Sequence, residues 1–289
     1  MPVYKVAAVV LRHQPVGEAD RVLTLFTLEY GKLRVSARGV RKTTSRLAGR
    51  VQPYTEGRFL LARGRTLDVV AQAEVVRSFA GLQQDLLRSA YAAYVAELVD
   101  RFLPERDRHA EVFAALVDAL GVIDTAGEDE AEVYALWFSL RLADSLGYRP
   151  ELDRCLACGR ALPSGAPSGD PDAVPAARGG AGWAFSPAAG GALCPACAAG
   201  ETSAVRVAPG VLATGAYLLR GTAEHARRLR VPERQRRALA ALVQAHLEYH
   251  LDGRLRAPAV IARLRQAGRG KIDAEVVPWK SISNGRSGR

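Results

Sequence analysis

Long apolar runs are absent from this sequence, and so is the layout of a secretion signal. No stretch reaches the about 18 apolar residues that a membrane span requires, and the first residues, Met-Pro-Val-Tyr-Lys, do not place a basic segment before an apolar one. The 289 residues are 48% hydrophobic and 24% charged, with 27 Gly and 15 Pro. This composition supports a packed core and excludes a disordered chain, a coiled coil and collagen. We therefore expect a soluble, cytoplasmic protein of one large or two ordinary domains.

Sequence motifs of the common enzyme classes are also missing. There is no G-x-x-x-x-G-K-[ST] phosphate loop, G-x-S-x-G elbow, H-E-x-x-H helix or strand-linked G-x-G-x-x-G turn. His246 and His250 are four residues apart on an expected helix, but no third metal ligand is nearby, so we interpret them as ordinary helix residues. The carboxylates at residues 128–130 suit the first turn of a helix better than an acid–base pair. We therefore expect that this protein is not an enzyme.

Lysine is scarce, because only five of the 40 basic residues are Lys. An Arg-rich composition can reflect genomic base bias, so the position of the charge is more informative than its net value of +10. Residues 1–80 carry 14 Lys or Arg against 6 Asp or Glu, residues 81–150 carry 6 against 13, and residues 151–289 carry 20 against 11. This alternation indicates at least two surfaces with different partners.

The first 80 residues have the pattern of short β-strands separated by turns. Apolar, β-branched or alternating segments predict strands at residues 3–11, 21–28, 33–37, 57–62 and 67–73. Gly31 can adopt the positive φ of a tight hairpin turn, and residues 63–65 form another turn. Five short strands in this length suit a small barrel, and the OB-fold is the common barrel of this size that binds nucleic acid.

The pattern changes to a helical one at Gly81. Apolar residues at helical spacing predict helices at residues 82–102, 112–120, 130–146, 209–219 and 233–251, with Gly121 ending the second. The fold class is therefore α+β and multi-domain: an OB-fold barrel at 1–80 and a helical domain at 81–265. Residues 152–200 interrupt the helical domain as an inserted module. Residues 266–289 have little periodicity and are expected to form a flexible tail.

All four cysteines fall in two knuckles with two residues between the thiols. The pairs are Cys155 with Cys158 and Cys194 with Cys197, a spacing that lets four thiolates surround one tetrahedral ion. The 35 residues between the pairs are more than is usual, but residues 163–182 are rich in Ala, Gly and Pro and can loop out. A set of four cysteines predicts one structural Zn²⁺ per chain. Two disulfides or redox pairs are the alternative, which a cytosolic chain disfavours.

A basic cluster follows the third expected strand. Residues 30–55 contain neither Asp nor Glu. The cluster consists of Arg34, Arg38, Arg41, Lys42, Arg46 and Arg50. Forked guanidinium donors match phosphate oxygens, so this segment is the candidate DNA-binding site. The alternative is a solvated loop on an Arg-rich protein. Nearby aromatic residues at positions 4, 26, 30, 54 and 59 could stack on bases, although most are expected in the core.

A second basic run surrounds the start of the last expected helix. It contains Arg227, Arg228, Arg230, Arg234, Arg236 and Arg237. Because helix surfaces are commonly charged, a solvated surface is the stronger interpretation of this run. It is a secondary candidate for binding nucleic acid or an acidic peptide.

The order of several short motifs along the chain resembles the RecO family of bacterial recombination mediators. The matching segments are residues 17–21 (GEADR), 26–32 (FTLEYGK), 37–41 (ARGVR), 47–53, 90–98, 146–150 (LGYRP), 155–159 (CLACG) and 186–194. They cover residues 1–256, whereas the segment after Pro258 does not match. The resemblance implies an N-terminal OB-fold, a helical C-terminal domain and a zinc module. It implies that the basic residues of segment 34–50 contact DNA and that the four cysteines bind zinc.

The resemblance also implies a function and partners. Family members bind single- and double-stranded DNA, anneal complementary strands, partner with RecR, contact the acidic tail of single-stranded-DNA-binding protein (SSB) and help to load the RecA recombinase. Such a protein would be cytoplasmic and associated with the nucleoid during repair. The competing hypothesis is a zinc-ribbon adaptor whose basic faces bind acidic proteins. A metal-dependent nuclease would need clustered carboxylates, whereas those of residues 1–80 are scattered.

Overall fold

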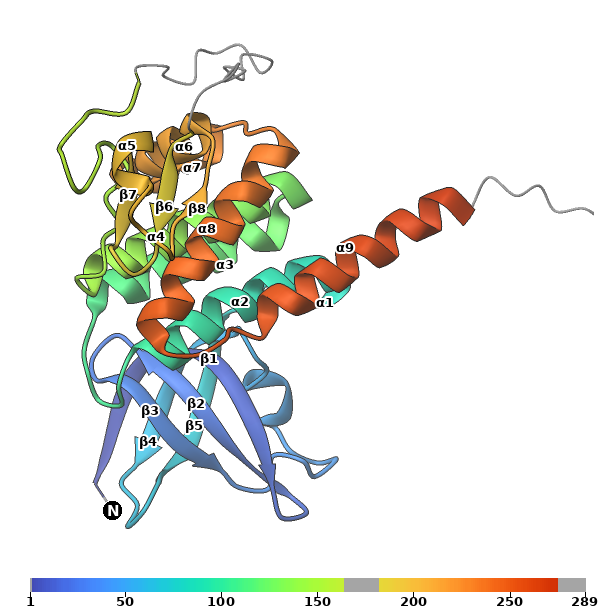
Figure 1. Ribbon diagram of the computed structural model, residues 1–289. Coiled ribbons are helices and arrows are strands. Elements are labelled where there is room, and N and C mark those ends of the chain that lie inside the picture. Colours follow the sequence, from blue (N-terminus) through green and yellow to red (C-terminus); the bar gives the residue numbers. More distant parts are fainter. Residues whose placement is uncertain (1, 164–181, 275–289) are drawn as a thin grey trace, which may run out of the picture.

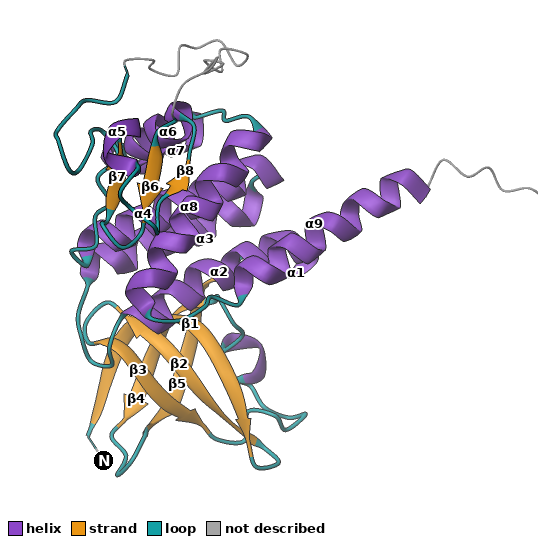
Figure 2. Ribbon diagram, in the orientation of Figure 1, coloured by secondary structure: helices purple, strands orange, loops and turns teal. Residues whose placement is uncertain are grey.

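The computed structural model describes residues 2–163 and 182–274. A β-barrel forms the N-terminal part, and a helical region lies against one side of it (Figure 1). Figure 2 separates the two by secondary structure, with the barrel strands below and helices above. The α+β architecture, with an N-terminal barrel and a helical C-terminal region carrying four close cysteines, confirms the predicted fold class.

The barrel is closed, and its strands follow the order of an OB-fold. Strands β1 (Val3–Val16), β2 (Asp20–Thr27), β3 (Gly31–Ala37), β4 (Glu56–Ala62) and β5 (Asp68–Arg77) pair in the order β1-β2-β3-β5-β4, and β4 returns to β1. Strand β1 is longer than predicted because it bends: its first half pairs with β4 and its second half with β2, with a bulge between Val10 and Arg12. The closed barrel leaves no long edge strand to be protected.

Side chains alternate between two separate cores. Leu23 and Leu25 of β2 point into the barrel together with Leu33 and Val35 of β3. On the opposite side of the same strands, Phe26 joins the core of the helical region. The helices therefore cover part of the outer surface of β1 and β2.

The chain segment between helices α2 (Leu86–Phe102) and α3 (Ala110–Thr125) also lies against the barrel. Gly31 has φ +66°, as the predicted turn requires, and a Cβ at this position would lie 1.8 Å from the carbonyl oxygen of Asp107. The backbone N–H of Arg106 donates to the carbonyl of Lys32 at 2.9 Å. Glycine is required here both for the turn and for the approach of the two backbones.

The helical region is built around α4, whose side chains are buried on nearly every face. Its helices are α1 (Ala80–Gln84), α2 (Leu86–Phe102), α3 (Ala110–Thr125), α4 (Glu128–Ser145), α6 (Pro209–Arg220), α7 (Ala223–Arg228), α8 (Glu233–Leu251) and α9 (Ala257–Ala274). The helix predicted from residue 82 is divided at Asp85, because its carboxylate accepts from the N–H groups of Leu87 and Arg88 and starts α2. The predicted end at Gly121 is wrong, since α3 continues through this glycine to Thr125.

Two helices of the helical region, α7 and α9, were not predicted. Helix α7 is short, and α9 extends away from the body of the molecule (Figure 1). The sequence predicts a flexible tail from residue 266, whereas α9 continues to Ala274. The glycines at 268 and 270 weaken helical periodicity in the sequence, although each costs only about 1 kcal/mol relative to alanine within a helix. Residues 275–289 of the expected tail lie outside the described residues.

The cysteine-containing segment forms a small unit on the helical region. Strands β6 (Ala184–Ser186), β7 (Gly191–Leu193) and β8 (Val205–Arg206) pair in the order β7-β6-β8, and α5 (Pro195–Ala198) follows β7. Trp183 and Phe185 of this unit belong to the same apolar core as the helices. None of the helices in the described ranges combines the length and apolar character needed to cross a bilayer.

Candidate nucleic-acid interface and metal centre

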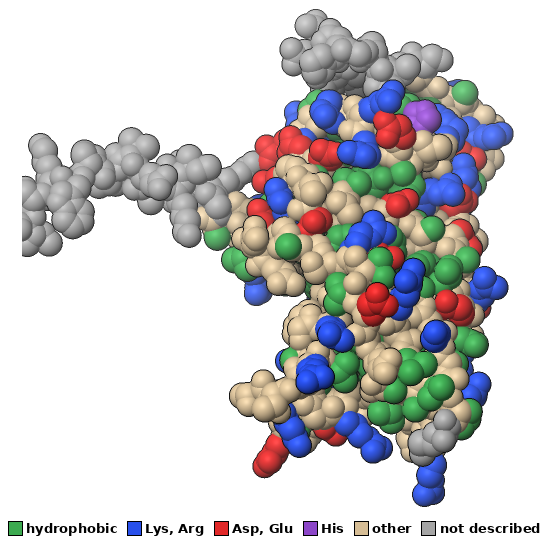
Figure 3. Space-filling model, turned by 180° about the vertical axis from the view of Figure 1, so that it is seen from behind, with side chains coloured by type: hydrophobic (Ala, Val, Ile, Leu, Met, Phe, Trp, Pro, Cys, Tyr) green, Lys and Arg blue, Asp and Glu red, His purple; other side chains and the backbone are tan. Residues whose placement is uncertain are grey.

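All six residues of the predicted basic site are exposed. Arg34 points outward from β3, and the other five lie on the connection between β3 and β4, which includes the short 3-10 helix η1 (Ala48–Arg50). The basic residues therefore follow one continuous segment over the surface of the barrel. In the view of Figure 3, Lys and Arg side chains outnumber Asp and Glu over the barrel end of the molecule.

The apolar residues of this connection explain why its basic residues face solvent. Val40 and Val51 are buried in the barrel core, and Leu47 and Ala48 pack against it. These side chains close one end of the barrel, so the charged residues between them remain outside, where their solvation is retained.

Hydrogen bonds hold the connection against the turn between β1 and β2. The backbone N–H of Gly39, which has φ +63°, donates to the carboxylate of Asp20 at 2.7 Å. The backbone N–H of Arg41 donates to the carbonyl of Ala19 at 2.8 Å. The segment is thus held in place by its backbone, and most of its side chains are left available for a ligand.

The charges of the segment are not neutralised within the chain. Nη1 of Arg41 donates to the carbonyl of Gly17 at 3.1 Å, and Nη1 of Arg50 donates to the carbonyl of Ala73 at 3.0 Å. Among residues 2–163 and 182–274, no carboxylate forms an ion pair with any of the six. Since a guanidinium has five N–H donors, both anchored arginines keep donors for a phosphate.

One further arginine, Arg12, lies on the sheet face beside Arg34. Strand register places Arg12, Thr24 and Arg34 side by side across β1, β2 and β3. Thr24 is buried between the two arginines, and Nε of Arg12 lies 2.6 Å from the carboxylate of Asp100 on α2. The outer face of these strands is the surface that OB-folds commonly use for oligonucleotides.

Most of the barrel aromatics are core residues, as expected. Phe59 is buried inside the barrel, and Phe26 packs against Phe113 of α3 with ring centroids 5.9 Å apart. Tyr30 is 42% exposed and meets Tyr4 edge to face at 5.3 Å. Burial and a hydrogen bond to Asp68 raise the pKa of Tyr4 to about 12, so its phenol stays protonated.

The two cysteine knuckles come together as predicted from their spacing. The sulfur atoms of Cys155, Cys158, Cys194 and Cys197 all lie within 4.8 Å of one another, and those of Cys158 and Cys194 are 3.7 Å apart. Metal–sulfur bonds of about 2.3 Å in a tetrahedron place the sulfurs about 3.8 Å apart. Gly159, with φ +71°, closes the turn under the first knuckle by donating its N–H to the carbonyl of Cys155 at 2.8 Å.

The protonation chemistry of the four thiols also fits a cation. Burial raises the pKa of Cys155, but backbone N–H groups, Cys194 first, outweigh it and lower the pKa to about 6. Hydrogen bonds with the other thiols, chiefly Cys194, raise the pKa of Cys197 to about 12. Four sulfurs at these distances cannot all be thiolates without a positive charge between them. The four cysteines could therefore hold one metal ion.

Several arginines of the second basic run are engaged in ion pairs within the chain. Arg236 is buried, where it contacts the carboxylates of Glu132 and Asp129. Most of the other arginines of the run pair with carboxylates: Arg227 with Glu130, Arg228 with Glu224 and Arg237 with Glu233. Nearby acidic residues, including two of the predicted helix-start carboxylates at 128–130, thus neutralise much of this run.

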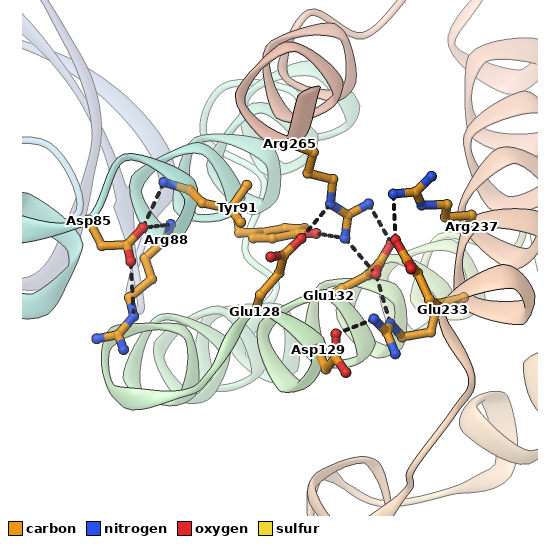
Figure 4. Close-up of polar contacts among 11 residues, drawn as sticks. Asp85, Arg88, Tyr91, Glu128, Asp129, Glu132, Glu233, Arg237 and Arg265 are labelled. Atoms are coloured by element: carbon orange, nitrogen blue, oxygen red, sulfur yellow. Dashed lines mark hydrogen bonds and ion pairs between the residues drawn. The ribbon is translucent and has the colours of Figure 1, made fainter. Parts of the chain in front are cut away.

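The buried ion pair of Arg236 belongs to a network joining the four helices α2, α4, α8 and α9. Figure 4 shows Glu132 of α4 between α8 and α9, with the guanidinium of Arg265 directed toward it. Arg265 Nη2 lies 2.6 Å from Glu132 Oε2 and donates to the hydroxyl of Tyr91 at 2.6 Å; its Nε lies 2.9 Å from Glu128. Sequence patterns give no sign of this network, because each of its two arginines lies more than 100 residues from its partners in the chain.

A cavity of about 420 Å³ lies beside this network, between α2, α4, α8 and α9. Leu136, Ala240 and Ile261 give it apolar walls, and Arg237 and Arg265 line its polar side. It combines an apolar interior with the charged groups of Arg237, Arg265 and Glu132.

His246 and His250 pack against each other on α8. His246 is buried, and its Nε2 lies 2.7 Å from the carbonyl oxygen of Tyr148. Its ring contacts His250 with centroids 4.6 Å apart. Within the described ranges, the four cysteines form the sole cluster of three or more side chains that could ligate a metal.

Comparison with known proteins decides the family. The family model described as "Recombination protein O N terminal" matches residues 1–79, and the one described as "Recombination protein O C terminal" matches residues 83–259. This chain belongs to the RecO family. The boundary between the two RecO matches falls at the junction of barrel and helices, and the second match ends near the start of α9.

Curated relatives are similar to this chain over nearly its whole length. The DNA repair protein RecO of Pelotomaculum thermopropionicum is 40% identical over 96% of this chain and all of its own length. That of Heliobacterium modesticaldum is 38% identical over 90% of each chain, and that of Roseiflexus sp. is 34% identical over 95% of this chain and 90% of its own length. RecO membership assigns the protein to DNA repair and recombination.

Proposed function

We propose that this protein is a non-enzymatic recombination mediator that binds single- and double-stranded DNA, anneals complementary strands and helps to load RecA on SSB-coated DNA. One observation carries the proposal: Arg34, Arg38, Arg41, Lys42, Arg46 and Arg50 are exposed on one segment and pair with no described carboxylate. In this proposal residues 1–80 are the DNA-binding domain and 81–265 the helical domain, with a zinc module at 152–200. The protein would act in the cytoplasm, at the nucleoid during repair.

Binding through charge, without base-specific contacts, suits a protein that anneals DNA strands. Guanidinium and ammonium groups that neutralise phosphates release counterions, and this contribution to affinity does not depend on base sequence. A mediator that anneals any complementary pair needs contacts of this kind, because base-specific contacts would restrict its substrates.

The deciding experiment measures annealing of complementary oligonucleotides coated with SSB, with and without the full-length protein. We expect acceleration at moderate salt and its loss in the Arg38→Ala/Arg46→Ala variant. The matched control is Arg228→Ala/Arg230→Ala, which removes two exposed arginines from the second run. A protein that binds acidic proteins but neither accelerates annealing nor binds DNA would be the zinc-ribbon adaptor instead.

We propose that the metal is one structural Zn²⁺ per chain, held by Cys155, Cys158, Cys194 and Cys197. Four sulfur donors leave no open position for a substrate, and cysteine-only sets are typical of structural zinc. The ion would tie the two knuckles together across the segment that separates them in the sequence, and so hold the module on the helical core.

The proposed protein partners are RecR, SSB and, indirectly, RecA. We place the acidic tail of SSB at the cavity between α8 and α9. Its apolar walls can accept an apolar side chain of the tail, and Arg237 at the margin, which is partly exposed, can exchange its surface partner Glu233 for a carboxylate of the tail.

A further inference from the structure

A row of aromatic rings lies on the helical region, apart from the basic segment of the barrel. Tyr148, in the segment after α4, stacks on His250 of α8 with centroids 4.5 Å apart and planes 24° apart. The ring centroid of Tyr249 lies 5.5 Å from that of His250. The ring centroid of Phe102, at the end of α2, lies 6.3 Å from that of Tyr148. Tyr148 is 39% exposed and Tyr249 is 54% exposed, so two aromatic rings remain open to solvent.

Arg101 and Arg149 are the chain neighbours of Phe102 and Tyr148. Arg101, Arg149 and Arg254 are all exposed, and Nη1 of Arg101 donates to the carbonyl of Arg254, which brings the ends of α2 and α8 together. Arg149 lies 3.1 Å from the carboxylate of Asp144. This pair is at the surface, where an ion pair contributes little and can be exchanged for a phosphate.

The ring row also adjoins the DNA face proposed for the barrel. The row of Arg34, Thr24 and Arg12 crosses three strands, a width of about 10 Å at the usual strand spacing. Arg12 then contacts Asp100, which precedes Arg101 and Phe102 at the end of α2. Figure 1 shows the C-terminal end of α8 beside this end of α2, above the barrel.

We infer that Tyr148 and Tyr249 form a base-stacking platform for single-stranded nucleic acid, flanked by Arg101, Arg149 and Arg254. The inference rests on the proposed DNA binding and extends it to the helical region. The barrel segment grips the backbone by charge, while the platform holds unpaired bases by stacking, which every base can do because each has a π-face. A base-paired duplex does not offer its base faces, so the platform favours single strands. Holding splayed bases near a basic segment would present them to a complementary strand.

The test compares two probes on the full-length protein: a labelled oligothymidylate and an oligomer of the same length and charge made of abasic sites. In the Tyr148→Ala/Tyr249→Ala variant we expect affinity for oligothymidylate to fall about 5-fold or more. Affinity for the abasic oligomer and the salt dependence should stay the same, because no phosphate contact is removed. The Tyr148→Phe/Tyr249→Phe variant keeps the rings and should bind as the wild type does.

Two controls keep the outcome interpretable. Tyr217→Ala removes a tyrosine outside the platform whose ring meets that of His225 edge to face, with centroids 6.0 Å apart. This variant should leave both affinities unchanged. If the double alanine variant fails to fold, photo-crosslinking of wild-type protein to oligonucleotides containing 5-iodouracil replaces it; crosslinks at Tyr148 or Tyr249 support the platform.

Equal losses on both probes, no loss on oligothymidylate, or crosslinks confined to the barrel would overturn the inference. These results differ from a failure of the proposed function. If only the platform is wrong, wild-type protein binds both probes and Arg38→Ala/Arg46→Ala weakens both. If DNA binding itself is wrong, wild-type protein binds neither.

Discussion

Nε of Arg236 lies 2.9 Å from Oε2 of Glu132, and the two side chains are only 5% and 3% exposed. Glu132 also forms an ion pair with Arg265 of α9, so one buried carboxylate contacts two guanidinium groups from two helices. Removing one member of a buried ion pair leaves the other charge without a partner in a poorly solvated place. These ion pairs link α9 to α4, while α2 provides the main packing surface of α9.

Glu132→Ala should lower the free energy of unfolding by about 3–5 kcal/mol, because it leaves Arg236 and Arg265 without their shared partner. Urea denaturation followed by circular dichroism measures this. Glu128→Ala is the matched control: Glu128 also pairs with Arg265 but is half exposed, so a loss below about 1 kcal/mol is expected. Equal losses in the two variants would contradict the role given to burial.

Arg38→Ala/Arg46→Ala should weaken binding to single strands of all sequences to a similar extent. Two lost phosphate contacts reduce the slope of log affinity against log salt by about 1.4, at about 0.7 per contact. Fluorescence anisotropy across a salt series measures the slope. Arg41 is a less suitable target, since its side chain also holds the turn at Gly17. An unchanged slope would show that these side chains do not face the strand.

Cys155→Ser should remove the metal and destabilise the module, because binding to a structural site contributes folding free energy. Elemental analysis should find about one zinc per wild-type chain and much less in the variant. Leu156→Ala, an exposed change within the same knuckle, should keep its zinc. Zinc should also be lost to a chelator more readily as the pH falls, since protons compete for the thiolates. A wild-type chain without zinc would remove this proposal.

Ala262→Trp should abolish binding of an SSB-tail peptide while DNA binding is retained. Ala262 is exposed on α9 and lines the cavity, so an indole there would occupy the space proposed for the peptide. Ala259→Trp, exposed on the same helix but outside the cavity lining, is the control. Peptide anisotropy should show a loss of about 10-fold or more, equivalent to about 1.4 kcal/mol, for Ala262→Trp alone. Unimpaired binding would place the tail elsewhere.

His246 should make the protein sensitive to acid. Burial lowers the pKa of His246. A hydrogen bond to the carbonyl of Tyr148 raises this pKa and the charge of His250 lowers it further, so that the net shift is downward. The folded protein then binds fewer protons than the unfolded chain just below the ordinary pKa of about 6.5, so stability falls as the pH drops through that range. His246→Gln should reduce the fall in Tm between about pH 7 and pH 5. The same pH dependence in variant and wild type would exclude His246 as the cause.

Much of the barrel and of the metal site could be predicted from the sequence because their signals are local. Alternating side chains identify the strands, Gly31 marks a turn that requires positive φ, and two residues between cysteines suffice for a knuckle. The exposure of the basic segment also follows from the local pattern of apolar and basic residues. Val40 and Val51 are the neighbours of basic residues in the chain, and they fill the end of the barrel while the basic side chains stay outside.

Only the tertiary structure decided which arginines are available to a ligand. Arg38 and Arg236 look alike in the sequence, each within a dense basic run, yet one is exposed and the other is buried against Glu132, 104 residues away. The same holds for Tyr148 and His250, which stack only because α8 folds back beside the end of α4. Composition and spacing specify which side chains are present, whereas their partners depend on how distant helices pack, and it is the partner that determines whether a charge or a ring remains free.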